Sequence, residues 1–321
     1  MGRRKIFLLN LRKIPRTDKS GQYFETTFRR SVSPIVFERQ SPKDPHNVAF
    51  VLQGPLVTEF DYTFLTAQTY LSKFPNAPII VSTWQGSDPR TIKKLRNAGV
   101  IVVESDPEAV APGLANANLQ MVTSHAGLTA ARELSAVYAI KTRTDQRIYN
   151  LEALEALPLL LKTFPIEGEA NQRARLLVPS LNTFAYRLYG VTDMLMFGHI
   201  DDMEQFWDGH LDDRTEYLHE HRTLREYSKL RLAEVYFTSR FLENRGEKLE
   251  WTVRDYWEKL AARFLVVDAG FLDMHWPKYT NIENRWGSWR SDPKFAEVSF
   301  AMWLQIWSGT AQPDESVLDR H

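Results

Sequence analysis

The feature that most constrains the fold is a regular alternation of apolar runs and amphipathic segments between residues 47 and 145. Four near-continuous apolar runs have the composition of strands buried on both faces: residues 47–56, 77–84, 100–106 and 138–145. Segments with helical spacing lie between them, at 62–74, 88–99 and 116–134. Strands that alternate with helices predict right-handed crossovers. We therefore expect an α/β, Rossmann-like fold with a mostly parallel central sheet flanked by helices.

Ligands of such sheets bind beyond the carboxyl ends of the strands. This rule makes the residues at the end of each apolar run candidate site residues. They are Gln53, Gly54 and Pro55 after the first run, Thr83 and Trp84 after the second, Ser105 and Asp106 after the third, and Arg143, Thr144 and Asp145 after the fourth. Because these ends converge on one edge of the sheet, the sequence predicts one binding crevice there.

Motifs and composition exclude several classes of protein. No GxGxxG follows the first run and no GxxxxGK[ST] occurs, which excludes a dinucleotide fingerprint and a P-loop. The chain has no cysteine, hence no disulfide, no thiolate nucleophile and no cysteine-bound metal, and it suits a reducing cytoplasm. Forty Lys and Arg balance forty Asp and Glu, so no overall field recruits nucleic acid. Nucleotide sugars, which bind without a glycine-rich phosphate loop, remain among the ligands of this architecture.

The pattern divides the chain into an N-terminal extension (1–46), a central domain (47–290) and a C-terminal helical tail (291–321). The pattern of the extension predicts one short strand followed by a polar connector. No segment of the sequence is typical of a membrane span. Its basic residues could contact an anionic membrane surface, although a solvated arm is the simpler interpretation. In the tail, helical spacing of aromatic residues predicts a stripe that packs on the core, or that meets a lipid-linked acceptor or a partner chain. That stripe comprises Phe300, Trp303, Leu304 and Trp307.

The central domain carries a run of motifs that resembles a protein family. The motifs are VLQGPL (51–56), FPNAPIIVSTWQG (74–86), VVESDP (102–107), NANLQMVTSHAGLTAAR (116–132), YAIKTRTDQRIYN (138–150), TDMLMFGHIDDMEQFWD (192–208), AEVYFTSRFLE (233–243) and FLVVDAGFLDMHWPKY (264–279). They occur in the order seen in the WavE-type lipopolysaccharide-synthesis proteins, which look like glycosyltransferases of the GT-A fold. The resemblance covers roughly residues 47–280.

This resemblance implies a GT-A-like fold and transfer of a sugar from a nucleotide donor during surface-glycan assembly. GT-A enzymes usually hold the donor diphosphate through Mg²⁺ or Mn²⁺, bound by a DxD at the end of the fourth strand. The matching residues here are Arg143, Thr144 and Asp145, with Arg143 where the first Asp would stand. Asp145 is therefore the expected metal ligand. Arg143 and Arg147 could bind the diphosphate directly, which leaves the metal requirement open.

The resemblance also implies candidates for a second metal ligand and a catalytic base. His275, in LDMHWPKY, is the candidate ligand, and a packed structural histidine is the alternative. Glu234 stands where similar GT-A proteins place an acidic residue, so Glu234 and Asp145 are the expected catalytic carboxylates. The alternative for Glu234 is a residue that complements the helix dipole. Asp201 and Asp202 form a further acidic pair, for which N-capping of the next helix is the simpler interpretation.

Donor-binding roles for the other strand-end residues have structural alternatives. Residues 53–55 could pass the base against backbone amides or form a turn. Residues 83–84 could shape the base pocket or belong to the core. Asp106 could reach the ribose hydroxyls or begin an Asp-Pro turn, and Asn118 and Gln120 could contact the donor or cap the helix at 116–134.

The leading interpretation is a nucleotide-sugar glycosyltransferase with a glycan or lipid-linked acceptor, in the cytoplasm or peripheral to the inner membrane face. A non-catalytic GT-A-like module that binds a nucleotide or sugar is the alternative, supported by Arg143 in place of an acid. A nucleotidyltransferase is disfavoured because no Gly- and Lys-bearing phosphate loop follows the first run. Donor sugar, acceptor and oligomeric state are left open.

Overall fold

The computed structural model describes residues 47–167, 171–214, 223–276 and 295–320 of the chain. The predicted N-terminal extension, with its short strand and basic residues, lies outside these described residues. The strands are β1 (Val48–Gln53), β2 (Ile79–Trp84), β3 (Ile101–Ser105), β4 (Tyr138–Arg143), β5 (Arg147–Ile148), β6 (Leu176–Pro179), β7 (Met196–His199), β8 (Phe264–Val267) and β9 (Met274–His275). The helices are α1 (Tyr62–Lys73), α2 (Pro89–Asn97), α3 (Ala117–Glu133), α4 (Leu151–Thr163), α5 (Ile200–Trp207), α6 (Leu224–Lys229), α7 (Ala233–Glu243), α8 (Val253–Arg263), α9 (Ala269–Leu272) and α11 (Phe300–Trp307).

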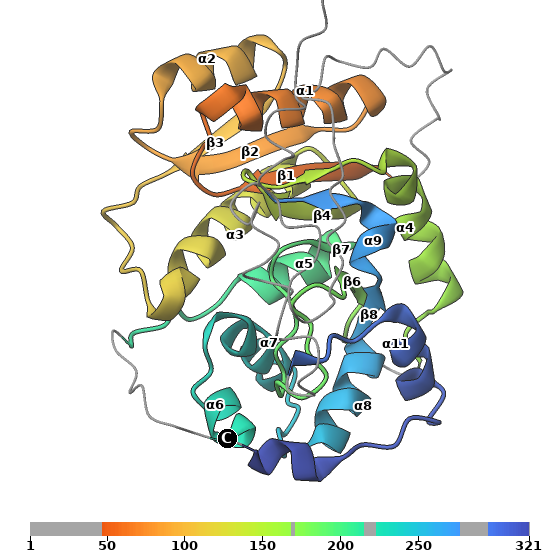
Figure 1. Ribbon diagram of the computed structural model, residues 1–321. Coiled ribbons are helices and arrows are strands. Elements are labelled where there is room, and N and C mark those ends of the chain that lie inside the picture. The colour runs from red at the N-terminus through yellow and green to blue at the C-terminus, as the bar shows by residue number, and fades with distance from the viewer. Residues whose placement is uncertain (1–46, 168–170, 215–222, 277–294, 321) are drawn as a thin grey trace, which may run out of the picture. The chain divides into compact units, whose positions relative to one another are not determined.

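A seven-stranded sheet in the order β3-β2-β1-β4-β7-β6-β8 organises the described residues (Figure 1). β1 pairs in parallel with both β2 and β4, β2 pairs in parallel with β3, and β6 pairs in parallel with β8. β7 runs antiparallel to its neighbours β4 and β6, so six strands share one direction. The predicted α/β fold with a mostly parallel, helix-flanked sheet is confirmed.

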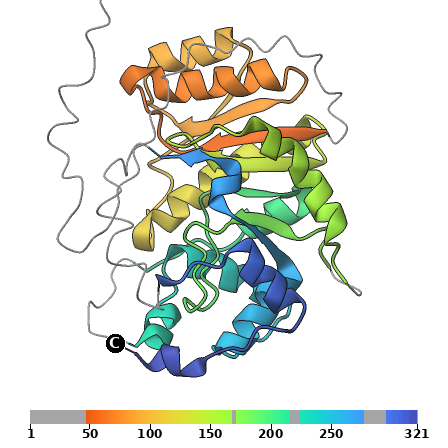
Figure 2. The ribbon, with the colours of Figure 1, turned by 45° about the vertical axis from the view of Figure 1, so that its right-hand side comes forward.

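Helices cover both faces of the sheet, because successive side chains of a strand point to opposite sides. Phe50 of β1 packs on α1, with its ring centroid 5.3 Å from Tyr70 and 5.0 Å from Phe74. The next residue, Val51, lies under α3 on the other face. Figures 1 and 2 show α1 and α2 on one side of the first three strands and α3 on the other. α5 continues the α3 layer over β7.

Gly127 lets α3 approach the sheet closely. A Cβ atom at this position would lie 2.4 Å from Cγ1 of Val51 and 3.1 Å from Cβ of Ser82. We expect Gly127→Ala to lower the free energy of unfolding by about 1–3 kcal/mol, as overpacked cores do, in urea unfolding measurements. Gly270→Ala in α9 is the matched control, because a Cβ atom there meets nothing within 4 Å. Equal stability of the two variants would contradict this packing.

The aromatic stripe of the C-terminal tail forms α11 and packs on the core. Trp303 is fully buried, and its Nε1 donates to the backbone oxygen of Phe264 in β8 at 3.0 Å. Its ring stacks on that of Trp307, which is 39% exposed, and meets Phe164 edge to face. Core packing is therefore the interpretation that the structure supports. Within the described ranges, no helix has both the length and the apolar character needed to cross a membrane.

Candidate functional site

The carboxyl ends of the six parallel strands lie on one edge of the sheet. Their last residues are Gln53, Trp84, Ser105, Arg143, Pro179 and Val267. The structure thus places the predicted strand-end residues along a single edge, where open α/β sheets bind their ligands. The binding role of each one stays a prediction and depends on what its side chain contacts.

At the centre of this edge, Arg143 and Asp145 form a two-pronged ion pair at the end of β4. Arg143 donates from Nε to Oδ1 of Asp145 at 2.9 Å and from Nη2 to Oδ2 at 3.1 Å. Trp276 donates from Nε1 to the same Oδ2 at 2.9 Å. The Arg143 guanidinium also lies over the Trp276 ring, 5.2 Å from its centroid. These three side chains are called the edge cluster below.

The edge cluster keeps Asp145 ionised. Burial by itself would raise the pKa of this carboxyl, but the hydrogen bonds and positive charge of Arg143 outweigh it and hold the pKa below its ordinary value. Trp276 lowers the pKa further through its hydrogen bond. The Arg143 and Asp145 side chains are 22% and 20% exposed, so the pair stays open to a ligand in solution.

Trp276 reaches Asp145 because β9 pairs with β5. The antiparallel register sets His275 opposite Arg147, and the backbone N–H of Tyr149 donates to the oxygen of Asp273 at 3.1 Å. His275 therefore comes to the end of β4, as its predicted role requires. Its imidazole lies near two tyrosines: the ring centroid is 6.0 Å from Tyr149, and Nδ1 is 3.5 Å from the hydroxyl of Tyr62.

The arrangement of these side chains does not present a preformed site for Mg²⁺ or Mn²⁺. Both oxygens of Asp145 accept N–H donors, and a guanidinium occupies the position next to the carboxylate. Within the described residues, no group of three or more His, Cys, Asp or Glu side chains could hold a metal ion. Such ions take several oxygen ligands. The cation bound by Asp145 and His275 stays a prediction, and the residues as placed do not fit it.

Arg147 is built into the fold rather than turned to the edge. It is 3% exposed, and its Nε donates to Oγ1 of Thr66 at 2.9 Å while Nη2 donates to the backbone oxygen of Tyr62 at 3.1 Å. The guanidinium also lies 4.6 Å from the centroid of the Tyr62 ring. These contacts fix β5 against α1. The direct contact between Arg147 and the diphosphate stays a prediction, and the guanidinium as placed does not fit it because it is hydrogen-bonded to α1 inside the fold.

The side-chain amides of two predicted donor-binding residues also form hydrogen bonds inside the fold. Gln53 is 2% exposed, and its Oε1 accepts from the hydroxyl of Thr123 in α3 at 2.8 Å. Asn118 is 1% exposed, donates to the backbone oxygens of Ala111 and Asp212, and accepts the backbone N–H of Asp212 at 2.6 Å. Both side chains hold α3 in place, and their predicted contact with the donor stays a prediction. The side-chain oxygen of Gln120, by contrast, is buried without a hydrogen-bond partner.

The predicted contact of residues 53–55 with a base stays a prediction, but two of the three backbone amides are not available for it. The N–H of Gly54 donates to the oxygen of Ser82 at 2.9 Å, and proline has no N–H. The buried Thr144 holds this loop against β4: its hydroxyl donates to the oxygen of Pro55 at 2.5 Å, and its N–H donates to the oxygen of Gln53 at 3.0 Å. Thr144 thus joins the ends of β1 and β4 beside the edge cluster.

The ends of β2 and β3 carry the remaining predicted residues. Thr83 is fully buried, with its hydroxyl 3.2 Å from that of Ser87, whereas Trp84 is partly exposed. Asp106 is exposed and accepts the backbone N–H of Glu108 at 2.9 Å, which is the turn that the structural alternative anticipated. A cavity of about 570 Å³ lies next to this region, lined by the turn after β2, the exposed face of α2 and Glu104.

Glu234 lies on the same edge, near the end of β6. It stands in the first turn of α7, as predicted, and its side chain is 17% exposed. Its Oε1 is 3.4 Å from Nδ2 of Asn182, which follows β6, and 3.5 Å from Nη2 of Arg187. Strand spacing of about 4.8 Å puts β6 roughly 10 Å from β4, across β7. Asn182, Arg187 and Trp276 were not predicted from the sequence; of the three, only Trp276 had a sequence signal, its position next to His275.

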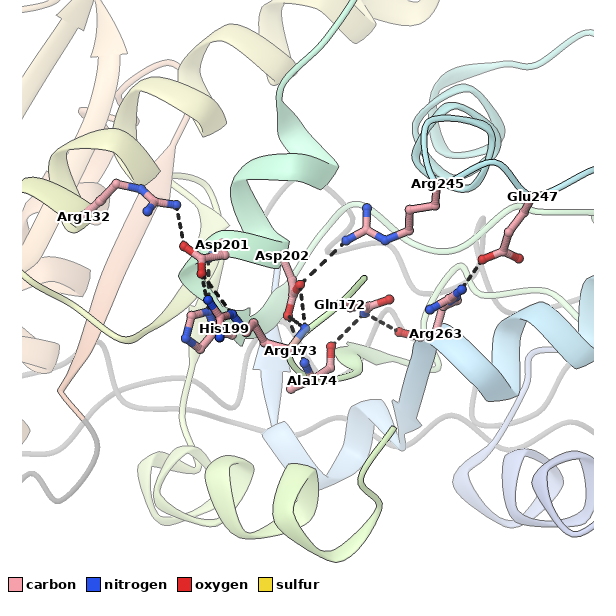
Figure 3. A network of polar contacts seen from close by, with 10 residues as sticks. All are labelled: Arg132, Gln172, Arg173, Ala174, His199, Asp201, Asp202, Arg245, Glu247 and Arg263. Carbon is pink, nitrogen blue, oxygen red and sulfur yellow. Dashed lines mark hydrogen bonds and ion pairs between the residues drawn. The ribbon is translucent and has the colours of Figure 1, made fainter. Parts of the chain in front are cut away.

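The acidic pair Asp201 and Asp202 lies at the opposite edge of the sheet, because antiparallel pairing sets His199 beside Tyr138 at the start of β4. Neither carboxylate caps α5: the cap is His199, whose Nδ1 accepts the N–H of Asp201 at 3.2 Å. Figure 3 shows Asp202 between the backbone of residues 173–174 and the side chain of Arg245. The prediction of an N-capping acid was wrong, since these carboxylates have other partners. They are not candidates for the base either.

Together, the sheet and the polar edge beyond its parallel strands define an α/β protein of the Rossmann-like class. The chain belongs to the WavE lipopolysaccharide synthesis family, whose model matches residues 48–270. The match confirms the resemblance that the sequence motifs indicated and connects the chain with lipopolysaccharide synthesis. A search among curated proteins found no match.

Proposed function

We propose that this chain is a glycosyltransferase that moves a sugar from a nucleotide-sugar donor to a glycan or lipid-linked acceptor in lipopolysaccharide or surface-polysaccharide synthesis. The observation that carries the proposal is the edge cluster, a partly exposed arginine held by a carboxylate at the end of the central strand β4. Charged side chains at that position suit a diphosphate. Membership of a lipopolysaccharide synthesis family also supports a role in the synthesis of this glycan.

The reaction needs a base for the acceptor, and Glu234 is the proposed one. The acceptor hydroxyl oxygen would form a bond to the anomeric carbon of the sugar while its proton passes to the Glu234 carboxylate. The bond from that carbon to the diphosphate oxygen would break, and the nucleoside diphosphate would leave with the electron pair. Glu234 suits this role because it is partly exposed on the same edge as Asp145 and is positioned by Asn182 and Arg187.

The proposal is tested by incubating the full chain with a panel of nucleotide sugars, with and without Mn²⁺, and measuring the nucleoside diphosphate released. Thermal shift with the same nucleotides reports binding independently of turnover. We expect one donor to be turned over. Glu234→Gln should keep the thermal shift and lower the rate by about 10²–10⁴-fold, the range typical of a lost general base.

Asp145→Ala should lower both turnover and nucleotide binding, because Arg143 and Trp276 both lose the carboxylate to which they donate. Asp201→Ala is the matched control, since this carboxylate lies at the opposite edge of the sheet. Absence of turnover and of any nucleotide-induced shift would overturn the proposal. A nucleotide-induced thermal shift without turnover, seen equally in the wild type and in Glu234→Gln with candidate acceptors present, would indicate a nucleotide-binding module.

A further inference from the structure

In the edge cluster, the positive charge next to the Asp145 carboxylate belongs to the side chain of Arg143. The two oxygens of Asp145 accept three N–H donors, two from Arg143 and one from Trp276. A divalent ion would have to approach a carboxylate oxygen to about 2.0–2.6 Å. To do so it would displace at least one of these donors and stand against the positive guanidinium.

We propose that the Arg143 guanidinium neutralises the donor diphosphate in this protein, that Asp145 positions the arginine rather than binding a metal, and that donor binding needs no divalent cation. This inference rests on the proposed function, because it specifies how the same edge holds its donor.

Arg143 is placed and held for this role. It ends β4, the strand in the middle of the sheet, and the ion pair and the Trp276 ring fix its otherwise flexible side chain. A guanidinium bears five N–H donors in a planar fork whose geometry matches phosphate oxygens. Holding the fork in advance lowers the entropy cost of binding a diphosphate.

Trp276 gives the pair a second stabilising contact. Its indole N–H satisfies Oδ2 of Asp145, so the carboxylate keeps a hydrogen bond if the arginine shifts toward a phosphate. Its ring face lies under the guanidinium, where cation–π attraction favours the charged group. Arg147, four residues further on, is buried against α1 and adds positive charge behind the edge without turning toward it.

The test is the affinity of ADP, CDP, GDP and UDP for the full chain, measured by isothermal titration calorimetry once in EDTA and once in Mn²⁺. We expect one of these nucleotides to bind with affinities that agree within about twofold in the two buffers. Arg143→Met should weaken its binding at least tenfold in both. Circular dichroism melts show whether each variant is folded.

Asp145→Asn separates the two roles of this residue. An asparagine keeps one oxygen for Trp276 and for Nη2 of Arg143, but it loses the acceptor of Nε and the negative charge. For a positioning residue we expect the diphosphate affinity to change by no more than a few fold, and by the same factor in EDTA and in Mn²⁺. A metal-ligand aspartate does not tolerate this change. Arg173→Met is the matched control, because Arg173 is a 70% exposed arginine that pairs with Asp201 at the opposite edge of the sheet. This variant should bind nucleotides with wild-type affinity.

Two results would overturn the inference, and they can be told apart. Binding that appears only with Mn²⁺ and is lost in Asp145→Asn would make Asp145 a metal ligand, while the proposed glycosyltransferase function would stand. No binding of any nucleoside diphosphate in either buffer would overturn both the inference and the proposed function.

Discussion

Asp202→Ala is expected to lower the free energy of unfolding by about 3–5 kcal/mol, the range found when one partner of a buried charge pair is removed. The Asp202 side chain is 1% exposed, and its carboxylate accepts the backbone N–H of Arg173 with both oxygens at 3.0 Å and that of Ala174 at 2.9 Å. The buried guanidinium of Arg245 lies 3.7 Å away. Alanine would leave the two backbone N–H groups without their acceptor and the Arg245 guanidinium without its counter-charge (Figure 3).

Asp201→Ala is the matched control for this prediction. The two residues are adjacent in α5, but the Asp201 side chain is 27% exposed, and its partners Arg132 and Arg173 are 45% and 70% exposed. Exposed pairs of this kind contribute about 0–1 kcal/mol. Urea unfolding of both variants measures the difference. A loss for Asp202→Ala no larger than that for Asp201→Ala would contradict the structural role of this carboxylate.

The second large effect is a pH dependence of stability that originates at Lys141. This residue lies in the middle of β4 with no exposed surface, and its Nζ donates to the backbone oxygen of Asp193 at 2.5 Å. The ammonium group is 4.1 Å from the centroid of the Trp207 ring. Burial lowers the pKa of Lys141 to about 7, although the charge of Asp193 opposes the shift.

The sign of the effect follows from proton binding. Between about pH 7 and pH 10 the unfolded chain carries a proton on this lysine and the folded chain does not, so folding becomes more favourable as the pH rises. Each pH unit corresponds to about 1.4 kcal/mol. The stability contributed by this depressed pKa is therefore present above the unfolded value and is lost as the pH falls toward 7.

Lys141→Met removes the titrating group and should remove this slope. Urea unfolding at several pH values between 7 and 9 should show wild-type stability gaining on the variant by about 2–3 kcal/mol across the range. Lys229→Met, which removes an exposed lysine of α6, is the control for loss of a positive charge. A difference between wild type and Lys141→Met that does not change with pH would contradict the shifted pKa.

Residues 47–145 show why the fold was predictable from the sequence. Apolar runs and helical spacing are local patterns, and crossovers between parallel strands have a fixed hand, so pattern and chirality together imply β1 to β4 and their helices. The antiparallel direction of β7 was not predicted. It depends on which neighbours a strand of four residues meets, and a short apolar run carries no record of direction.

The candidate site divides in the same way. Strand-end position was predicted for Arg143 and Asp145 because the carboxyl edge follows from the topology. The contacts of each side chain were not predicted, because they depend on which residues of other elements pack against it. Gln53 accepts a hydrogen bond from a threonine of α3, and Arg147 donates one to a threonine of α1, so both side chains are bound inside the fold.

What the sequence determined by itself is the α/β sheet, the edge where its parallel strands end, and the family, since all three depend on patterns and motifs read along the chain. Only the tertiary structure decided the chemistry at that edge. Pairing of β9 with β5 brings Trp276 across 131 residues of sequence to Asp145, which already binds Arg143. Contacts at such separation arise from packing, which no local pattern encodes, and they decide which groups surround the Asp145 carboxylate.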